Sequence, residues 1–113
     1  MKITVHQVTE KVMVVRLEGR LDAHTAPTLK ERIAALVGDG VAQLIVNLAK
    51  VDFIDSSGLA ALVSGMKRTR LQGGNLKLVA VQSVAMRVFE LTLLDRVFEF
   101  YPDEEAAVAS LSQ

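Results

Sequence analysis

Two segments of this chain indicate its fold most clearly: Leu44-Ile45-Val46-Asn47-Leu48 and, shortly after it, Asp55-Ser56-Ser57-Gly58-Leu59. The first segment is an almost unbroken apolar run, as expected for a strand that is covered on both faces of a sheet. The second segment opens a helix whose apolar stripe continues through Leu62, Val63 and Met66. A buried strand that leads into a helix through a short polar segment is typical of α/β folds.

The flanking segments alternate between strand patterns and helix patterns. We expect an antiparallel hairpin over residues 2–6 and 12–17, a helix from Thr25 to Gly38, a helix from Ser57 to Leu71, a strand over 76–81, a helix through Val84, Val88 and Leu91, a strand over 97–101 and a short helix from Pro102. These elements predict one α/β domain over residues 1–113. Its mixed five-stranded sheet begins with the hairpin, continues by β-α-β crossovers and carries about four helices.

Two polar loops are expected to meet at one edge of this sheet. After Gly19 the chain is predicted to turn through residues 20–25, and residues 52–57 form the second loop. Loops that leave the carboxyl ends of neighbouring parallel strands gather on one edge, where ligands and partners usually dock. Asp22 and Asp55 are therefore expected to lie near the serine pair.

The serine pair Ser56-Ser57 has two interpretations. Asp and Ser are ordinary helix caps, and a cap contributes about 1 kcal/mol to a helix. The start of a helix also carries free N–H groups and the positive end of the helix dipole, so it suits a phosphoryl group. Two hydroxyls stand where one cap is enough, Gly58 leaves room for another protein, and Phe53 and Ile54 either flank the site or belong to the core.

Composition narrows the possible partners. The chain has 113 residues, half of them apolar, a formal net charge of zero and no cysteine. No basic stripe indicates nucleic acid or a charged membrane surface, no segment reaches bilayer-spanning length, and thiolate chemistry is excluded. We expect an intracellular protein whose partner is another protein, with no nucleic acid or membrane partner and no cofactor.

Other chemistry is poorly represented. Ser56, Asp22 and His24 could be arranged as a hydrolase triad, but a nucleophile elbow requires glycine two residues before the serine, where this chain has Ile54. His6 and His24 do not show metal-ligand spacing, so no metal site is expected. The glycine pairs around residues 39 and 73 lack the spacing and the lysine of a phosphate loop. We expect no catalytic residues.

The string Val51-Asp52-Phe53-Ile54-Asp55-Ser56-Ser57-Gly58-Leu59 resembles the STAS-domain anti-sigma-factor antagonists. The resemblance extends to the upstream stretch Gly19-Arg20-Leu21-Asp22-Ala23-His24-Thr25-Ala26 and to the downstream stretch Gly73-Gly74-Asn75-Leu76-Lys77-Leu78, and it covers essentially the whole chain in order. It implies a single STAS-like domain that binds an anti-sigma factor and so frees a sigma factor in the bacterial cytoplasm.

In that family the anti-sigma factor is also a serine kinase, and a metal-dependent serine phosphatase reverses its action. The resemblance assigns the phosphorylated residue to Ser56, whereas the chemistry of the segment leaves Ser57 open as an alternative. It implies partner contacts at Asp22, His24, Thr25, Asp55, Ser57, Gly58 and Leu59. A STAS subunit of another signalling or lipid-transport complex, with no sigma factor involved, is the alternative function.

A phosphate on Ser56 is expected to change binding and not the fold. It adds about −1.5 to −2 charges beside carboxylates that are already present. The start of the helix can hold that charge internally. The edge then becomes more negative and bulkier, so we expect affinity for the partner to fall without unfolding.

Overall fold

The computed structural model describes residues 1–111, so the last two residues of the expected domain 1–113 lie outside it. Five strands and four α-helices are found in this part of the chain: β1 Lys2–Thr9, β2 Val12–Leu21, α1 Ala26–Gly38, β3 Gln43–Ile54, α2 Ser56–Leu71, β4 Asn75–Val79, α3 Ser83–Leu91, β5 Glu99–Tyr101 and α4 Glu104–Ser110, with a 3-10 turn over Leu94–Arg96. The expected order of strands and helices is confirmed.

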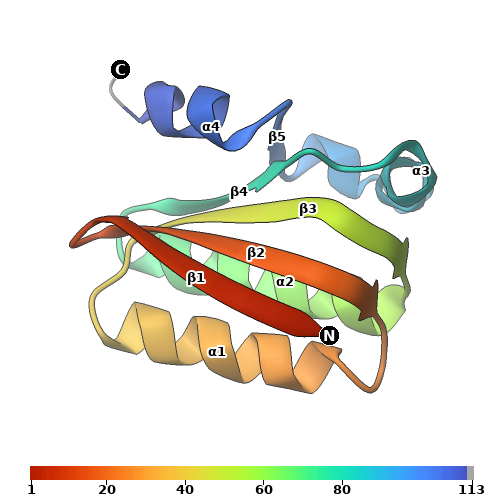
Figure 1. The fold of residues 1–113 in the computed structure, drawn as a ribbon, viewed down its shortest axis with the longest axis horizontal. Coiled ribbons are helices and arrows are strands. Elements are labelled where there is room, and N and C mark those ends of the chain that lie inside the picture. Colours follow the sequence, from red (N-terminus) through yellow and green to blue (C-terminus); the bar gives the residue numbers. More distant parts are fainter. Residues whose placement is uncertain (112–113) are drawn as a thin grey trace.

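The strands form one mixed sheet in the order β1-β2-β3-β4-β5. β1 pairs with β2 antiparallel, and the other neighbours are parallel. Helices α1 and α2 cover one face of the sheet, and the short α4 lies on the other (Figure 1). This is the mixed five-stranded α/β fold predicted from the sequence.

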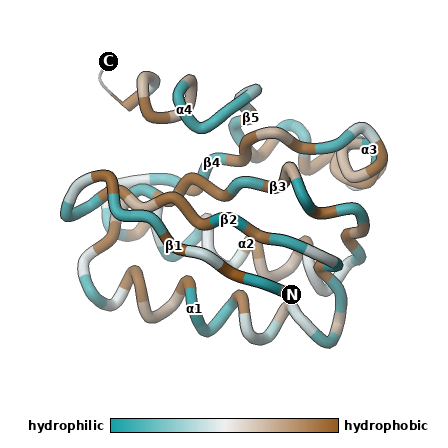
Figure 2. The backbone as a smooth tube through the Cα atoms, in the orientation of Figure 1, coloured by the Kyte–Doolittle hydropathy of each residue, from teal (hydrophilic) through white to brown (hydrophobic). Residues whose placement is uncertain are grey.

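Two apolar clusters hold the layers together. The larger one joins the inward side chains of the sheet to α1, α2 and α3, and the smaller one joins Val14, Ile45 and Val79 to Ala107 of α4. Leu44, Ile45, Val46 and Leu48 are all buried. β3 is therefore covered on both faces, as its apolar run predicted. It is the central strand of the sheet, and hydrophobic segments of the backbone gather around it (Figure 2).

Three strands are longer than the sequence predicted, and the first of them, β1, runs to Thr9 and not to residue 6. β2 continues to Leu21 and β3 continues to Ile54, where the sequence predicted a turn after Gly19 and a loop over residues 52–57. Gly19 has a φ of +115°, and the pairing register shifts beside it, so the glycine forms an irregularity within the strand. The pairing between β2 and β3 stabilises polar segments that show no strong strand pattern of their own.

The α3 region also differs from expectation. The helix is present, but Val84 is 66% exposed and Leu91 is 82% exposed, while Ala85 and Phe89 face the core. The ring of Phe89 packs edge-on against Phe98 and Phe100. The stripe that predicted the helix is therefore largely on its outer side, and β5 is shorter than the expected strand over 97–101 because the 3-10 turn precedes it.

Candidate functional site at the carboxyl ends of β2 and β3

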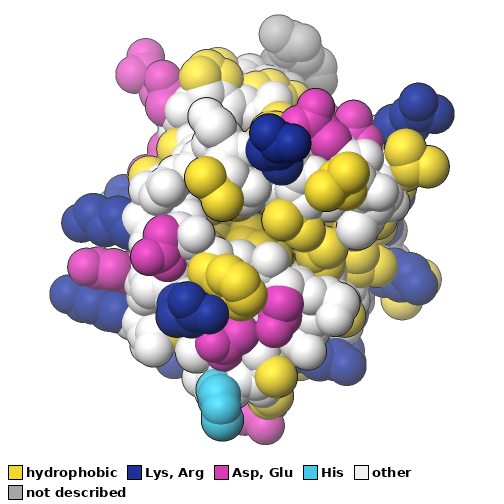
Figure 3. Space-filling model, turned by 90° about the vertical axis from the view of Figure 1, so that its right-hand side faces the viewer, with side chains coloured by type: hydrophobic (Ala, Val, Ile, Leu, Met, Phe, Trp, Pro, Cys, Tyr) yellow, Lys and Arg dark blue, Asp and Glu magenta, His cyan; other side chains and the backbone are white. Residues whose placement is uncertain are grey.

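The two polar loops meet as expected. Leu21 and Ile54 are register partners at the ends of β2 and β3, and the N–H of Asp55 donates to the carbonyl of Leu21 at 3.2 Å. Asp22 and Asp55 are therefore the next residues on two neighbouring parallel strands. Figure 3 views the end of the molecule where these strands terminate, and acidic side chains and one histidine are visible there.

Asp55 is the N-cap of α2. Its Oδ1 accepts a hydrogen bond from the N–H of Gly58 at 3.0 Å, and its backbone is extended. Ser56 and Ser57 consequently occupy the first two helical positions, and neither hydroxyl has a hydrogen-bond partner within residues 1–111. The segment therefore caps α2, as one interpretation predicted, but through the Asp55 carboxylate and not through a serine hydroxyl.

The serine hydroxyls differ in accessibility. Ser56 is exposed, whereas Ser57 is half-buried. The N–H groups of both residues lie in the first turn, where a helix offers no backbone acceptor for them. A phosphate on Ser56 would therefore find free N–H donors and the positive end of the α2 dipole close by.

Asp22 and Thr25 organise the loop between β2 and α1. Asp22 Oδ1 accepts from the N–H groups of His24 and Thr25 at 3.0 and 3.3 Å, and the Thr25 hydroxyl donates to the carbonyl of Arg20 at 2.7 Å. Burial opposes ionisation, but these backbone hydrogen bonds and Arg20 hold the pKa of Asp22 below its ordinary value. The carboxylate is ionised and fixed, and His24 beside it is exposed.

Two of the residues expected to contact a partner are buried. A Cβ on Gly58 would lie 2.6 Å from the carbonyl oxygen of Leu21 and 2.7 Å from its Cγ. The expectation that Gly58 leaves room for another protein is therefore wrong, since β2 already fills that space. Leu59 is only 5% exposed and belongs to the core. It therefore anchors the start of α2 on the core and offers little surface to a partner.

Arg20 and Phe53 form a contact that no pattern in the sequence indicates. They are register partners on β2 and β3, and the Arg20 guanidinium lies 4.0 Å from the centre of the Phe53 ring. Arg20 also approaches Asp22 Oδ2 at 3.5 Å. Phe53 is 36% exposed whereas Ile54 is buried, so only the phenylalanine flanks the polar site. The sequence alone could not predict this contact, because it depends on the register between β2 and β3.

A groove opens beside Ser57, between the first turns of α1 and α2. Its volume is about 390 Å³, and small residues line it, with Lys30 and Ser57 as its polar side chains. Ala23, Ala26 and Pro27 form the α1 side, and Ala60 and Ala61 form the α2 side. The groove gives a partner protein a concave surface directly next to the serine pair.

The site offers binding and modification chemistry. Its groups are the carboxyl groups of Asp22 and Asp55, free hydroxyls and free N–H donors around one helix start. Residues 1–111 contain no cluster of three or more histidine, aspartate or glutamate side chains that could hold a metal ion. Within the same residues, no helix has the length and apolar character needed to cross a bilayer.

Residues 4–107 match the family model of the STAS domain. The chain belongs to this family. A relative from Bacillus subtilis strain 168, an anti-sigma-B factor antagonist, is 32% identical over 99 residues, which span 88% of this STAS domain chain and 90% of the relative. The resemblance inferred from the serine segment is thus confirmed at the level of the family.

Solved structures of similar proteins agree with this assignment. An anti-sigma factor antagonist from Mycobacterium paratuberculosis superposes with a TM-score of 0.87 at 30% identity and covers 99% of this chain and 94% of its own. The phosphorylated form of the Bacillus cell fate determinant SpoIIAA superposes with a TM-score of 0.77 at 25% identity, covering 97% and 99% of the two chains. A protein of this fold is therefore known in a phosphorylated form.

Proposed function

We propose that this STAS domain is an anti-sigma-factor antagonist that is switched off by phosphorylation of Ser56. The observation that carries the proposal is the exposed Ser56 hydroxyl at the start of α2, which is left free because Asp55 caps the helix. The relatives named anti-sigma-B factor antagonists and the phosphorylated SpoIIAA structure support the same assignment. The partner is an anti-sigma factor with serine kinase activity, and a serine phosphatase restores the unmodified form.

The domain accommodates the phosphate without refolding. The Ser56 oxygen attacks the γ-phosphorus of ATP held by the kinase, the bond from that phosphorus to the bridging oxygen breaks to release ADP, and the hydroxyl proton passes to a base of the kinase. The new phosphate carries about −1.5 to −2 charges and lies among the free N–H groups of the first turn of α2. Charge at this position favours the helix, so the fold persists in both forms.

The same charge disfavours the complex. A kinase that modifies Ser56 must bring nucleotide phosphates against this hydroxyl, so a phosphoserine would face negative charge across a desolvated contact. Asp22 and Asp55 add further negative charge on the antagonist side. Phosphorylation therefore acts through repulsion and size and releases the kinase.

The domain itself acts by binding in this proposal and catalyses nothing, and the switch operates in the cytoplasm. Its relatives are regulatory proteins by name. Asp22, His24, Asp55 and the groove beside Ser57 form the contact surface, while Thr25, Gly58 and Leu59 hold that surface in place.

A pair of serine variants tests the proposal. The anti-sigma factor encoded in the same genome is incubated with ATP and with the natural chain, Ser56→Ala or Ser57→Ala, and phosphate is located by peptide mass mapping. We expect one phosphate on the natural chain and on S57A, none on S56A, and binding of all three unmodified chains. No binding of the anti-sigma factor by the natural chain would favour the alternative of a STAS subunit in another complex.

A further inference from the structure

A pocket lies on the face of the sheet opposite α1 and α2, beside α4. Its volume is about 290 Å³, close to the lower end of the range typical of small-ligand pockets. α4 packs over β3, β4 and β5, so the β1 and β2 side of this face stays open (Figure 1). We call it the sheet pocket, and the polar side chains that line it are those of Lys2 and Thr4 on β1, Arg16 and Glu18 on β2, and Asn47 and Lys50 on β3.

The strand register explains why cationic side chains meet there. Lys2 on β1 and Lys50 on β3 are both register partners of Glu18 on β2. Arg16 lies two residues before Glu18 and therefore on the same face of β2. The two lysines come from the strands on either side of Arg16, so the three cations surround one pocket although they are far apart in the sequence.

A bulge in β3 turns Lys50 toward the sheet pocket. From Asn47 to Lys50, β3 advances three residues while its partner β2 advances two. Ala49 and Lys50 are consequently both exposed, whereas strict alternation would place one of them in the core. The Ala49 N–H donates to Asn47 Oδ1 at 2.9 Å, and its carbonyl accepts from Gln82 Nε2 at 2.7 Å. Side chains thus hold the bulge, and bulges commonly redirect a side chain next to a site.

Arg16 is held in place and still has free donors. Its Nε and Nη2 each donate to the Glu104 carboxylate of α4 at 2.8 Å, and Asn47 donates to the same carboxylate at 2.7 Å. Arginine has more N–H donors than these two bonds use, and the remaining ones have no partner within residues 1–111. A guanidinium that is already fixed by a neighbouring carboxylate is oriented in advance for a further anion.

The charges around the sheet pocket favour an anion. Glu18 is the one carboxylate among the lining residues, and Glu104 adds a second from its place on Arg16. Three cations therefore face two carboxylates, which leaves an excess of positive charge. Lys2 and Lys50 form no ion pair within residues 1–111, so their ammonium groups are available to a ligand.

We propose that the sheet pocket binds a small organic molecule through its phosphate or carboxylate group, which Arg16, Lys2 and Lys50 contact. Guanidinium and ammonium groups are the side chains that proteins most often use for such oxyanions. The Thr4 hydroxyl can donate to the same group. The site goes beyond the proposed function, because it lies on the α4 face of the sheet and shares no residue with the serine site.

Three probes of similar shape test the proposal. Glycerol phosphate, glycerate and uncharged glycerol are each titrated at low salt into the isotope-labelled full chain, and the amide shifts are followed by NMR. We expect saturable shifts around Lys2, Arg16 and Lys50 with glycerol phosphate, glycerate or both, and none with glycerol. The anion that binds more tightly identifies the group that the sheet pocket recognises.

Matched variants decide whether the sheet pocket or general surface charge holds the anion. Lys50→Gln should weaken binding at least about fivefold, whereas Lys67→Gln, at an exposed lysine of α2 beyond the other face of the sheet, should change it less than about twofold. Glu18→Gln removes the carboxylate of the lining and should strengthen binding about threefold, while Glu10→Gln in the turn after β1 should have no effect.

The thermal midpoint of each variant is recorded, and E18Q serves as the test if K50Q lowers it. No saturable shift with either anion would overturn the proposal. Equal losses of affinity in K50Q and K67Q, or unchanged affinity in E18Q, would overturn it as well.

Discussion

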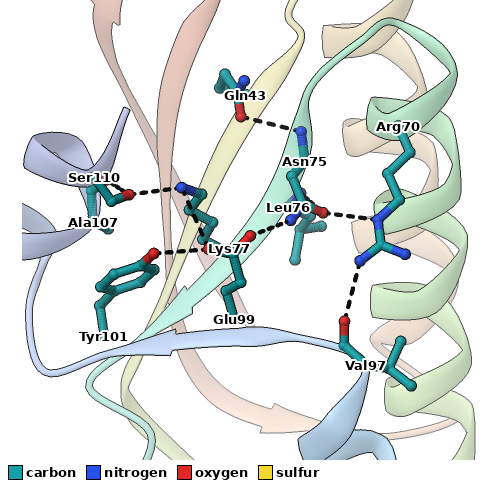
Figure 4. Close-up of polar contacts among 10 residues, drawn as sticks. All are labelled: Gln43, Arg70, Asn75, Leu76, Lys77, Val97, Glu99, Tyr101, Ala107 and Ser110. Atoms are coloured by element: carbon teal, nitrogen blue, oxygen red, sulfur yellow. Dashed lines mark hydrogen bonds and ion pairs between the residues drawn. The ribbon is translucent and has the colours of Figure 1, made fainter. Parts of the chain in front are cut away.

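The two ends of the sheet treat their polar side chains in opposite ways. At the start of β4, the Asn75 side chain donates from Nδ2 to Glu99 at 2.8 Å and accepts from Arg70 at 3.1 Å (Figure 4). The backbone N–H of Asn75 donates to Gln43 Oε1 at 3.1 Å. At the ends of β2 and β3, the hydroxyls of Ser56 and Ser57 have no partner within residues 1–111. Both ends are polar. At the start of β4 the polar side chains bond to one another, whereas at the ends of β2 and β3 the Asp22 and Thr25 side chains are bonded and the two serine hydroxyls are free.

The network at the start of β4 extends across the second face of the sheet. Lys77 is only 7% exposed, and its Nζ donates to the Ser110 hydroxyl at 2.6 Å, lies 3.7 Å from Glu99 and faces the ring of Tyr101. Satisfied polar groups of this kind fix the position of β5 and α4. The comparison teaches that polar groups bonded to one another maintain this fold, whereas those left free are available to a partner.

The largest effect is expected at the ends of β2 and β3, which we call the free end because the serine hydroxyls there have no partner within residues 1–111. A substitution there should lower affinity for the partner and leave stability unchanged. Ser56→Glu places negative charge in the first turn of α2, so affinity for the anti-sigma factor should fall at least about a hundredfold, or about 2.7 kcal/mol. The free energy of unfolding should stay the same or rise by about 0.5 kcal/mol because the charge suits the helix dipole. Calorimetric titration and urea denaturation measure the two quantities.

Ala35→Glu is the control for S56E. It adds the same charge at an exposed position near the C-terminus of α1, away from the serine site, and it should leave affinity unchanged. If S56E lost as much free energy of unfolding as free energy of binding, the claim that the serine end governs binding and not stability would be contradicted.

At the start of β4, which we call the closed end, a substitution should lower stability and leave affinity unchanged. Asn75→Ala removes the partner of Arg70 and Glu99, so the free energy of unfolding should fall by about 2 kcal/mol while affinity stays constant. Urea denaturation of N75A and of Gln72→Ala, an exposed neighbour, provides the measurement. If N75A also weakened binding of the anti-sigma factor, the two ends would not be independent.

Asp55 lies at the ends of β2 and β3 beside the free serine hydroxyls, but its own side chain caps α2, so its substitution should change stability as well as binding. Asp55→Ala removes the cap of α2 and should lower the free energy of unfolding by about 1 kcal/mol. Asp55→Asn keeps a good cap and should restore that stability. Thermal unfolding of the two variants checks this, and equal destabilisation by both would mean that the charge of Asp55 matters more than its hydrogen bond.

The smallest expected effect concerns pH and the tie between α4 and the sheet. Hydrogen bonds from Arg16, opposed by burial and aided by Asn47, lower the pKa of Glu104. A lowered pKa in the folded state means that the stabilisation is present at neutral pH. It is lost as the pH falls below the unfolded value, about 4.3, and through the folded one.

Glu104→Gln should therefore be less stable than the natural chain at neutral pH, by about 1 kcal/mol or less, and should lose less stability on acidification. Glu105→Gln, its exposed neighbour in the same first turn, is the matched control and should keep the natural pH dependence. Urea denaturation at a series of pH values would show the difference. Parallel pH profiles for E104Q and the natural chain would contradict this role of Glu104.

Local patterns predicted most of the fold correctly. The apolar run at Leu44–Leu48, Pro27 at the start of α1 and Gly73-Gly74 after α2 mark their elements through short-range chemistry. The adjacency of Asp22 and Asp55 followed from parallel topology alone. Phosphorylation at Ser56 and the partner contacts stay predictions, because they concern a second molecule.

The order of the elements and the polar segment at the start of α2 follow from local patterns in the chain, because periodicity, caps and turns act over a few residues. The folded structure was needed to establish that Asp55 and not a serine caps α2, that Gly58 packs on Leu21, and that Val84 faces outward. These outcomes depend on the register between β2 and β3 and on how far β3 extends beyond β4. Pairing and packing between distant segments set both, and no local pattern encodes them.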